Sequence, residues 1–263
     1  MAHNQMTDYL ELRSDVSVCT FNCRSIKSST VEVKNLCETH DIVAIQEHSL
    51  LPFELDILSN IHGDFLSTGT SAVNVSQNVL VGRPYGGTAI LYNKKLATCV
   101  TVIDTLETRC TAIVLHTNVG PVLVVNVYMP TDYGNFDSYE DYNELCAKIT
   151  AMYNDADAVY LLVLGDFNCS LYSRFYNILS NFMSDNDLIC SDLTRLHDIF
   201  TYCRDDCQNT SWIDHFLCSK APVMLSLGLG LGLKTNFFGL GLGLGLALSG
   251  LGLGLGLEPL RSC

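Results

Sequence analysis

Positive charge is scarce in this sequence. Fifteen Lys and Arg stand against 28 Asp and Glu among 263 residues, which gives a formal net charge of -13, and there is no run of basic residues. Because nucleic acids are usually bound by basic surfaces, this balance predicts low affinity for DNA from the domain alone. It does not exclude a nuclease, since a divalent metal ion can neutralise phosphate locally.

The sequence also lacks the patterns of a secreted or zinc-binding protein. Residues 1–15 are polar, so we expect no secretory signal peptide. The 12 cysteines are scattered. Two pairs stand four residues apart, Cys19 with Cys23 and Cys203 with Cys207, but neither is accompanied by a further CxxC-type pair or by a His at zinc-finger spacing. We therefore expect free thiols in a reducing compartment, the cytoplasm or the nucleus.

Residues 225–257 differ from the rest of the chain because Leu and Gly alternate there, and 11 of the 19 glycines fall in this range. Residues 235–257 are uncharged and long enough for a transmembrane helix, but Gly is a poor helix former. A packed strand is disfavoured as well, since alternate glycines offer nothing to pack. We favour a low-complexity tail over residues 221–263 that lies outside the fold, with no membrane partner.

Several apolar β-type runs end in, or carry, polar side chains. Such side chains meet at the carboxyl edge of an α/β sheet, where carboxylates and amides can position water and stabilise charge on a phosphate. Each signal is weak alone, because tight turns also favour Gly, Asp and Asn. The occurrence of such residues in several successive runs is hard to explain by turns alone. These residues are Asn22, Glu47, Tyr128, Asp166, Asn168 and Asp214.

These motifs resemble, in their order, the endonuclease/exonuclease/phosphatase superfamily. The residues that carry the resemblance are Asn22, Gln46-Glu47, Tyr128-x-Pro130, Gly165-Asp166-Phe167-Asn168 and Ile213-Asp214-His215. FNCRSIKSS, RPYGGTAILY, SWIDHFLCS and Thr201, thirteen residues before Asp214, are most similar to the apurinic-like endonuclease domains of non-LTR (LINE-type) retrotransposons. The resemblance covers about residues 16–220.

The alternation of strands and helices predicts an α/β protein, and the resemblance implies a four-layer α/β sandwich of two mixed sheets flanked by helices. Its terminal strand or strands are expected to be missing, because the tail replaces them. Helices are expected over 29–39, where Ser29 and Glu32 form a capping-box pattern, and over 139–153 and 173–183. Strands are expected at 16–22, 42–46, 88–92, 99–104, 111–117, 122–128, 159–164 and 213–217.

The resemblance also implies a function, Mg²⁺-dependent hydrolysis of phosphodiesters by a DNA-nicking endonuclease, with Mn²⁺ as the alternative ion. Asn22 and Glu47 would hold the metal. The remaining roles would be activation of water by Asp166, stabilisation of the oxyanion by Asn168 and Tyr128, orientation of a His by Asp214, and support or phosphate contact by Thr201.

One element of the family pattern is absent. Members of the family carry a Ser-Asp-His motif about two dozen residues after the Ile-Asp strand, whereas no His follows His215 here. His48 and His215 are candidate substitutes, but each alternates with its acidic neighbour and would point to the opposite face of an extended segment. We therefore expect impaired activity. Two alternatives stay open: an inert retroelement remnant that serves as a binding scaffold, and an enzyme of the same fold that hydrolyses a lipid or nucleotide phosphodiester.

Overall fold

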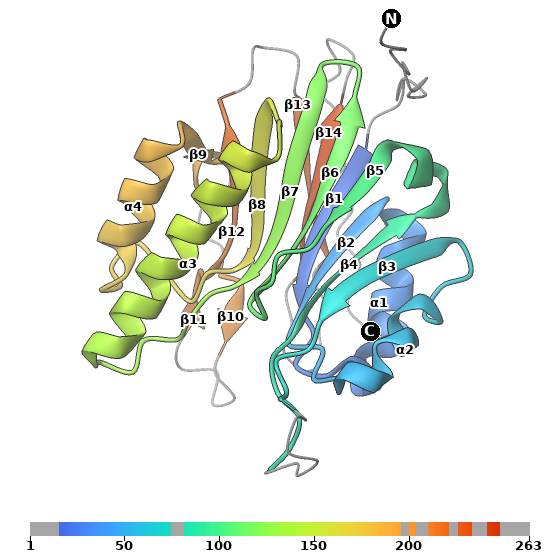
Figure 1. Ribbon diagram of the computed structural model, residues 1–263, viewed down its shortest axis with the longest axis horizontal. Helices are drawn as coiled ribbons and strands as arrows, with labels where there is room; N and C mark the ends of the chain where they lie inside the picture. The colour runs from blue at the N-terminus through green and yellow to red at the C-terminus, as the bar shows by residue number, and fades with distance from the viewer. Residues whose placement is uncertain are drawn as a thin grey trace, which may run out of the picture.

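Two six-stranded β-sheets face one another in the computed structural model, which describes residues 16–74, 82–195, 200–203, 210–220 and, for the backbone, 226–232 and 241–247 (Figure 1). The first sheet has the strand order β13 (Ser226–Gly232), β14 (Gly241–Ala247), β1 (Val16–Asn22), β2 (Ile42–Gln46), β4 (Thr88–Asn93) and β3 (Phe65–Thr70). The second has the order β5 (Val100–Ile103), β6 (Cys110–Thr117), β7 (Gly120–Tyr128), β8 (Tyr160–Asp166), β12 (Asp214–Ser219) and β9 (Leu188–Cys190). A short hairpin joins β10 (Tyr202–Cys203) to β11 (Thr210–Ser211).

Helices cover the outer faces of both sheets. The first sheet is covered by α1 (Ile26–Thr39) and by α2 (Asp56–Ser59), which follows the short helix η1 (Pro52–Glu54). The second is covered by α3 (Phe136–Asp155) and α4 (Tyr176–Asp185), on the left of Figure 1. Two smaller helices are η2 (Lys94–Cys99) and α5 (Ser191–Arg195). The expected four-layer α/β sandwich is thus confirmed.

The apolar runs of the sequence become strands that are buried on both faces. In β7, Leu123 and Val125 pack toward α3, whereas Val122 and Val124 pack between the two sheets. A strand covered on both sides needs apolar side chains at every position, which is why these segments read as continuous rather than alternating hydrophobic runs.

Strand direction brings the predicted polar residues to one end of the sandwich. The parallel pair β1–β2 sets Asn22 beside Gln46, and the parallel pair β7–β8 sets Tyr128 beside Asp166. The antiparallel strand β12 begins there, with Asp214 opposite Asp166. All these strand ends lie at the lower end of the molecule in Figure 1.

The first helix starts earlier than the capping-box pattern predicts. It begins at Ile26, with Ser25 as its N-cap, and Ser29 has non-helical backbone angles inside it (φ -114°, ψ 18°). The reason is local, because the hydroxyl of Ser29 donates a hydrogen bond to the carbonyl of Cys23 at 3.0 Å. Ser29 therefore marks a kink rather than the start of the helix.

The tail also differs from expectation in part. Two of its segments form β13 and β14, and β14 pairs antiparallel with β1, so the first sheet does not lack its outer strands. The physical reason is that a sheet edge presents unpaired N–H and C=O groups, which an extended backbone can satisfy without particular side chains. The rest of residues 221–263 lies outside the described residues, and the domain boundary after residue 220 stays a prediction. Within the described segments, no helix is both long and apolar enough to cross a membrane.

The pairing of β14 with β1 can be tested by truncating the chain after Lys220. Removal of β14 uncovers one edge of β1, so backbone amides of Val16–Thr20 that face β14 should exchange with solvent much faster, at least tenfold. Hydrogen–deuterium exchange with peptide resolution measures this. The strand β3, at the other edge of the same sheet, serves as the control and should be unaffected. Equal protection of β1 in both chains would contradict the pairing.

Candidate active site

The side chain of Asn22 joins the two sheets at their polar end. Its amide nitrogen donates to Oε1 of Glu47 at 2.7 Å and to Oδ2 of Asp166 at 2.9 Å. Its carbonyl oxygen accepts from the backbone N–H of Arg24 at 3.1 Å, which fixes the orientation of the amide. Residues 25 and 144 positions apart in the sequence therefore share one cluster. The structure brings Asn22, Glu47 and Asp166 into direct contact, as the motif order predicts.

Asp166 and Asp214 are buried side by side in the same cluster, with exposed fractions of 4% and 5%. Burial raises the pKa of Asp166 to about 6, against the hydrogen bonds from Asn168 and Asn22 that lower it. Burial also raises the pKa of Asp214 well above its usual range, and the charge of Asp166 adds to this effect. Two like charges in a desolvated place favour a protonated form. A carboxyl that titrates near neutrality is suited to accept a proton from water.

Tyr128 faces the carboxylates from the end of β7. Its hydroxyl hydrogen-bonds Glu47, and burial, followed by the charges of Glu47 and Asp166, raises the pKa of the phenol. Tyr128 is thus a protonated donor at neutral pH. The guanidinium of Arg109 lies 5.6 Å from the centre of the ring. Arg109 is a neighbour that the sequence did not single out, since it directly precedes β6 and belongs to no recognisable motif.

Asn168 forms hydrogen bonds with the end of β8 and with the segment that follows β7. Its backbone N–H donates to Oδ1 of Asp166 at 2.9 Å, and its side-chain amide donates to the carbonyl of Met129 at 2.8 Å. The amide nitrogen carries two protons, and these contacts use one of them. Within the described part of the chain no acceptor takes the other proton, so the predicted role of Asn168 as a donor to a substrate fits the geometry.

Thr201 supports the start of β12. Its hydroxyl oxygen accepts from the backbone N–H groups of Ile213 at 3.0 Å and Asp214 at 3.1 Å, and it also hydrogen-bonds the carboxyl of Asp214. The residue is 6% exposed. Of the two roles expected for Thr201, these contacts favour support of Asp214 over contact with a phosphate.

Two residues of the cluster have a left-handed backbone. The φ angle is 54° at Glu47 and 46° at Asn168. Asn adopts this conformation readily, but for Glu it costs about 1 kcal/mol or more. Strain of this kind is found mainly where the surroundings hold a residue in place for function. The turn after β2 therefore directs Glu47 toward Asn22 at a conformational cost.

Neither candidate His reaches the cluster. His48 is buried, with Nε2 at 3.0 Å from the carbonyl of Thr70 and Nδ1 accepting from the backbone N–H of Leu50. His215 lies on the helix-covered side of β12, where Nδ1 is 2.8 Å from Oδ2 of Asp192. Both positions agree with the expected alternation, and both rings are held by contacts within the core.

The carboxylates fit a hard cation. The charge of Glu47 raises the pKa of Asp166, and the charges of Asp166 and Glu47 raise the pKa of Asp214. Within the described part of the chain none of the three carboxylates forms an ion pair with Lys or Arg. Carboxylate and amide oxygens are the ligands that Mg²⁺ and Mn²⁺ prefer. Glu47, with Asn22 beside it, is therefore placed to hold such an ion. The positive charge of the ion would offset the repulsion between the carboxylates.

A second group of donors is already engaged with itself. The thiol of Cys190 donates to Oδ1 of Asp192 at 3.1 Å, and the backbone N–H of Phe216 donates to the same oxygen at 2.8 Å. The other carboxylate oxygen faces His215. We interpret this group as a buried hydrogen-bond network that holds α5 against β12.

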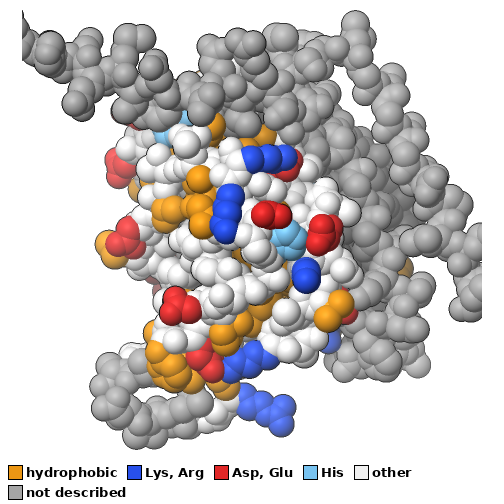
Figure 2. All heavy atoms as spheres, turned by 90° about the vertical axis from the view of Figure 1, so that its right-hand side faces the viewer, with side chains coloured by type: hydrophobic (Ala, Val, Ile, Leu, Met, Phe, Trp, Pro, Cys, Tyr) orange, Lys and Arg blue, Asp and Glu red, His pale blue; other side chains and the backbone are white. Residues whose placement is uncertain are grey.

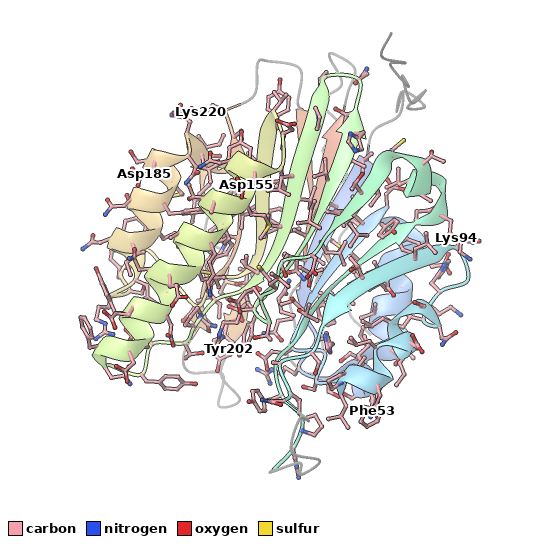
Figure 3. All side chains as sticks on the ribbon, in the orientation of Figure 1. Phe53, Lys94, Asp155, Asp185, Tyr202 and Lys220 are labelled. Atoms are coloured by element: carbon pink, nitrogen blue, oxygen red, sulfur yellow. The ribbon has the colours of Figure 1, made fainter. Side chains whose placement is uncertain are left out.

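The site occupies the end of the sandwich at which Tyr202 and Phe53 are labelled in Figure 3, on the sides of the second and the first sheet. Both aromatic side chains are exposed, Tyr202 at 38% and Phe53 at 73%. Elements associated with both sheets therefore reach this end of the sandwich, β10 with Tyr202 and η1 with Phe53.

Comparison with protein families identifies the family of this chain. Residues 19–231 match the Endonuclease/Exonuclease/phosphatase family. The chain belongs to this family. Its match extends into β13, so it includes part of the tail. Comparison with curated protein sequences finds no match.

Solved structures of similar fold come from several members of the family. The 3' phosphatase NExo from Neisseria, bound to a product DNA hairpin, is 18% identical, with 88% of this chain and 99% of that chain covered and a TM-score of 0.64. The endonuclease domain of TRAS1, a telomere-specific non-LTR retrotransposon, is 13% identical over 89% and 99% of the two chains, with a TM-score of 0.62. The catalytic domain of Xenopus laevis APE2 is 15% identical over 89% and 93%, with a TM-score of 0.65. At these identities the likeness establishes the fold.

Gly165 allows β8 to place Asp166 in the cluster. Its φ is +140°, and a Cβ at this position would overlap the carbonyl oxygen of Val127 on the neighbouring strand. Only glycine permits this conformation together with this close approach.

Replacing Gly165 by Ala should therefore lower the free energy of unfolding by about 3 kcal/mol, because it adds strain and overpacking at once. Chemical denaturation measures the loss. Gly63→Ala is the matched control, since no atom lies within 4 Å of the added Cβ there. A Gly165→Ala variant as stable as Gly63→Ala would show that β8 does not need glycine at this point.

Proposed function

We propose that this protein is a divalent-metal-dependent phosphodiesterase that nicks DNA, similar to the endonuclease of a non-LTR retrotransposon. The observation that carries the proposal is the contact of Asn22 with both Glu47 and Asp166, next to Tyr128 and Asp214. Membership of the family and the fold agree with phosphoester chemistry. The sequence segments shared with retrotransposon endonucleases favour DNA over a lipid or nucleotide substrate.

Glu47 and Asn22 would hold Mg²⁺ or Mn²⁺. When bound, the ion would supply Lewis acidity to the phosphate and to the leaving oxygen. Glu47 accepts one hydrogen bond from Asn22 and one from Tyr128, so its carboxylate is oriented before any ion binds. This preorganisation reduces the reorganisation needed on binding.

The protein's own groups divide the remaining chemistry. Asp166, with its raised pKa, would position a water molecule and take its proton. The second amide proton of Asn168 and the phenol of Tyr128 would donate to the phosphoryl oxygen as negative charge develops. Asp214 would orient a cationic partner, the role that the family resemblance implies for it.

Charge limits the affinity for DNA. On the face covered by α1 and α2, basic side chains are interspersed with acidic ones (Figure 2), and Lys27 pairs with Glu54 as Lys95 does with Asp41. Paired charges attract a polyanion weakly. The Neisseria 3' phosphatase of the same fold is bound to a DNA hairpin. We infer that this chain contacts DNA with low affinity and mainly at the site.

Glu47→Gln should weaken Mn²⁺ binding at least tenfold, because it removes the charged ligand while keeping the shape of the side chain. Isothermal titration calorimetry or the EPR signal of free Mn²⁺ measures the dissociation constant. Glu140→Gln, an exposed position on α3, is the matched control and should bind like the wild type. Identical binding by Glu47→Gln would remove Glu47 from the metal site.

The purified chain should nick supercoiled plasmid in Mg²⁺ slowly. We expect a rate on the order of 10²- to 10³-fold below that of a family endonuclease with an intact terminal Ser-Asp-His, because one cationic donor to the phosphate is lacking. Asp166→Ala should abolish the residual nicking, and Asp185→Ala, at the exposed end of α4, should leave it unchanged.

Four further results distinguish the alternatives. Restored nicking after a Ser-Asp-His-bearing terminal strand is grafted in place of residues 225–263 would support the impaired-nuclease proposal. Hydrolysis of a small phosphodiester such as bis(p-nitrophenyl) phosphate, with no nicking, would favour a different phosphodiesterase. Fast nicking by the unmodified chain would show that the expectation of impaired activity is wrong. Absence of any activity in the grafted chain would favour an inert remnant.

A further inference from the structure

Two buried amides face each other just beneath the site. The core between the sheets is apolar along β2 and β7, for example at Ala44 and Val124. The next inward-facing residue on each strand is polar: Gln46 on β2 and Asn126 on β7, both fully buried. We call Gln46 and Asn126 the amide pair. Buried polar groups in an apolar core must be hydrogen-bonded, so their partners are informative.

Asn126 reaches across from the second sheet to two strands of the first. Its amide nitrogen donates to the carbonyl of Ile45 on β2 at 2.8 Å and to the carbonyl of Ala89 on β4 at 2.9 Å. Its carbonyl oxygen accepts from the amide nitrogen of Gln46. Ile45 and Ala89 are directly paired in the sheet. The side chain of Asn126 is thus hydrogen-bonded to two adjacent strands of the opposite sheet, β2 and β4.

Gln46 extends the connection to the strand that carries Asn22. Its amide nitrogen also donates to the hydroxyl of Thr20 on β1 at 2.9 Å. Both amide protons of Gln46 are therefore committed, one to each sheet. The bonds that cross between the sheets are those of Asn126, to Gln46, Ile45 and Ala89, and a displacement of one sheet relative to the other would stretch and misalign all three.

The amide pair lies close to the side chains that form the site. Gln46 directly precedes Glu47, and Asn126 is two residues before Tyr128 on the same strand. Asn126 is also opposite Leu164, two residues before Asp166. Because a strand advances about 3.3 Å per residue, the pair is within roughly 7 Å of the site along each strand.

Repulsion within the site acts against this connection. Glu47 comes from the first sheet, whereas Asp166 and Asp214 come from the second, and the charge of Glu47 raises the pKa of both. Like charges on facing sheets favour separation of the sheets at this end. Apolar packing is non-directional and resists sliding poorly, whereas hydrogen bonds between buried amides fix both distance and register.

We propose that Gln46 and Asn126 are positioning residues: the amide pair sets the distance between Glu47 on one sheet and Tyr128 and Asp166 on the other. The consequence for metal binding rests on the function proposed above. Without the pair, the sheets stay packed through their apolar core, but Glu47 moves relative to its neighbours and the metal site loses its preorganisation.

The test is Asn126→Leu, which keeps the branched shape and the number of heavy atoms of the side chain and removes its hydrogen bonds. We expect Mn²⁺ to bind 10- to 100-fold more weakly, the range seen when a group that orients a metal ligand is lost. A second measurement does not depend on metal. The side-chain amide of Asn22, bonded to Glu47 and Asp166, should give slowly exchanging ¹⁵N–¹H signals in the wild type and fast-exchanging ones in the variant.

Thr111→Val is the matched control. The hydroxyl of Thr111 donates to the carbonyl of Thr88 at 2.9 Å, so it also joins the sheets through a buried hydrogen bond. It connects β6 to β4, neither of which carries a residue of the carboxylate cluster. This variant should lose stability without any change in Mn²⁺ affinity or in the Asn22 signals.

Each outcome decides the proposal. Unchanged Mn²⁺ affinity and unchanged Asn22 signals in folded Asn126→Leu overturn it. If Asn126→Leu does not fold, Gln46→Met replaces it, and failure of both variants to fold assigns the pair to general stability and overturns the positioning role. Absence of Mn²⁺ binding in the wild type contradicts the proposed function instead, and the Asn22 signals then decide the positioning role alone.

Discussion

The rest of this structure depends on one constraint, the clustering of three acidic side chains at one end of the sandwich, two of them buried. Glu47, Asp166 and Asp214 reach the same end of the sandwich from two sheets, and their desolvation and mutual repulsion are unfavourable. The apolar core supplies the free energy that offsets this cost, and the amide of Asn22 reduces it by donating to two of the carboxylates. The negative charge of the carboxylates that remains uncompensated favours binding of a cation at the site.

The sequence predicted the architecture well because the relevant information is local. Doubly buried strands such as β2 and β8 are continuous apolar runs, and each ends in a residue that no core would tolerate without partners. Parallel strands bring such ends to one edge within each sheet, and the family resemblance of the ordered motifs supplied the expectation that Asn22, Glu47 and Asp166 meet across the two sheets.

What the sequence did not reveal depends on contacts distant along the chain. The polar strand β3 forms because β4 offers it a free edge, and its own residues give a weak strand pattern. The hydroxyl of Thr201 is committed to β12, and Arg109 lies against Tyr128. Asn126 interrupts an apolar run, which was a visible signal for a buried polar contact, but its partners 37 and 81 residues away were not.

The Leu-Gly sequence of β14 has a consequence for the edge of β1. A two-residue repeat is restored by a shift of two residues, so β14 can slip along β1 and recover the same alternation in the new position. Ordinary strands are held in one register because a shift mismatches their side chains with those of their neighbours. Here several alignments are nearly degenerate in free energy. The Leu-Gly repeat therefore favours pairing of a strand with the edge of β1 more strongly than it favours any one register of that pairing.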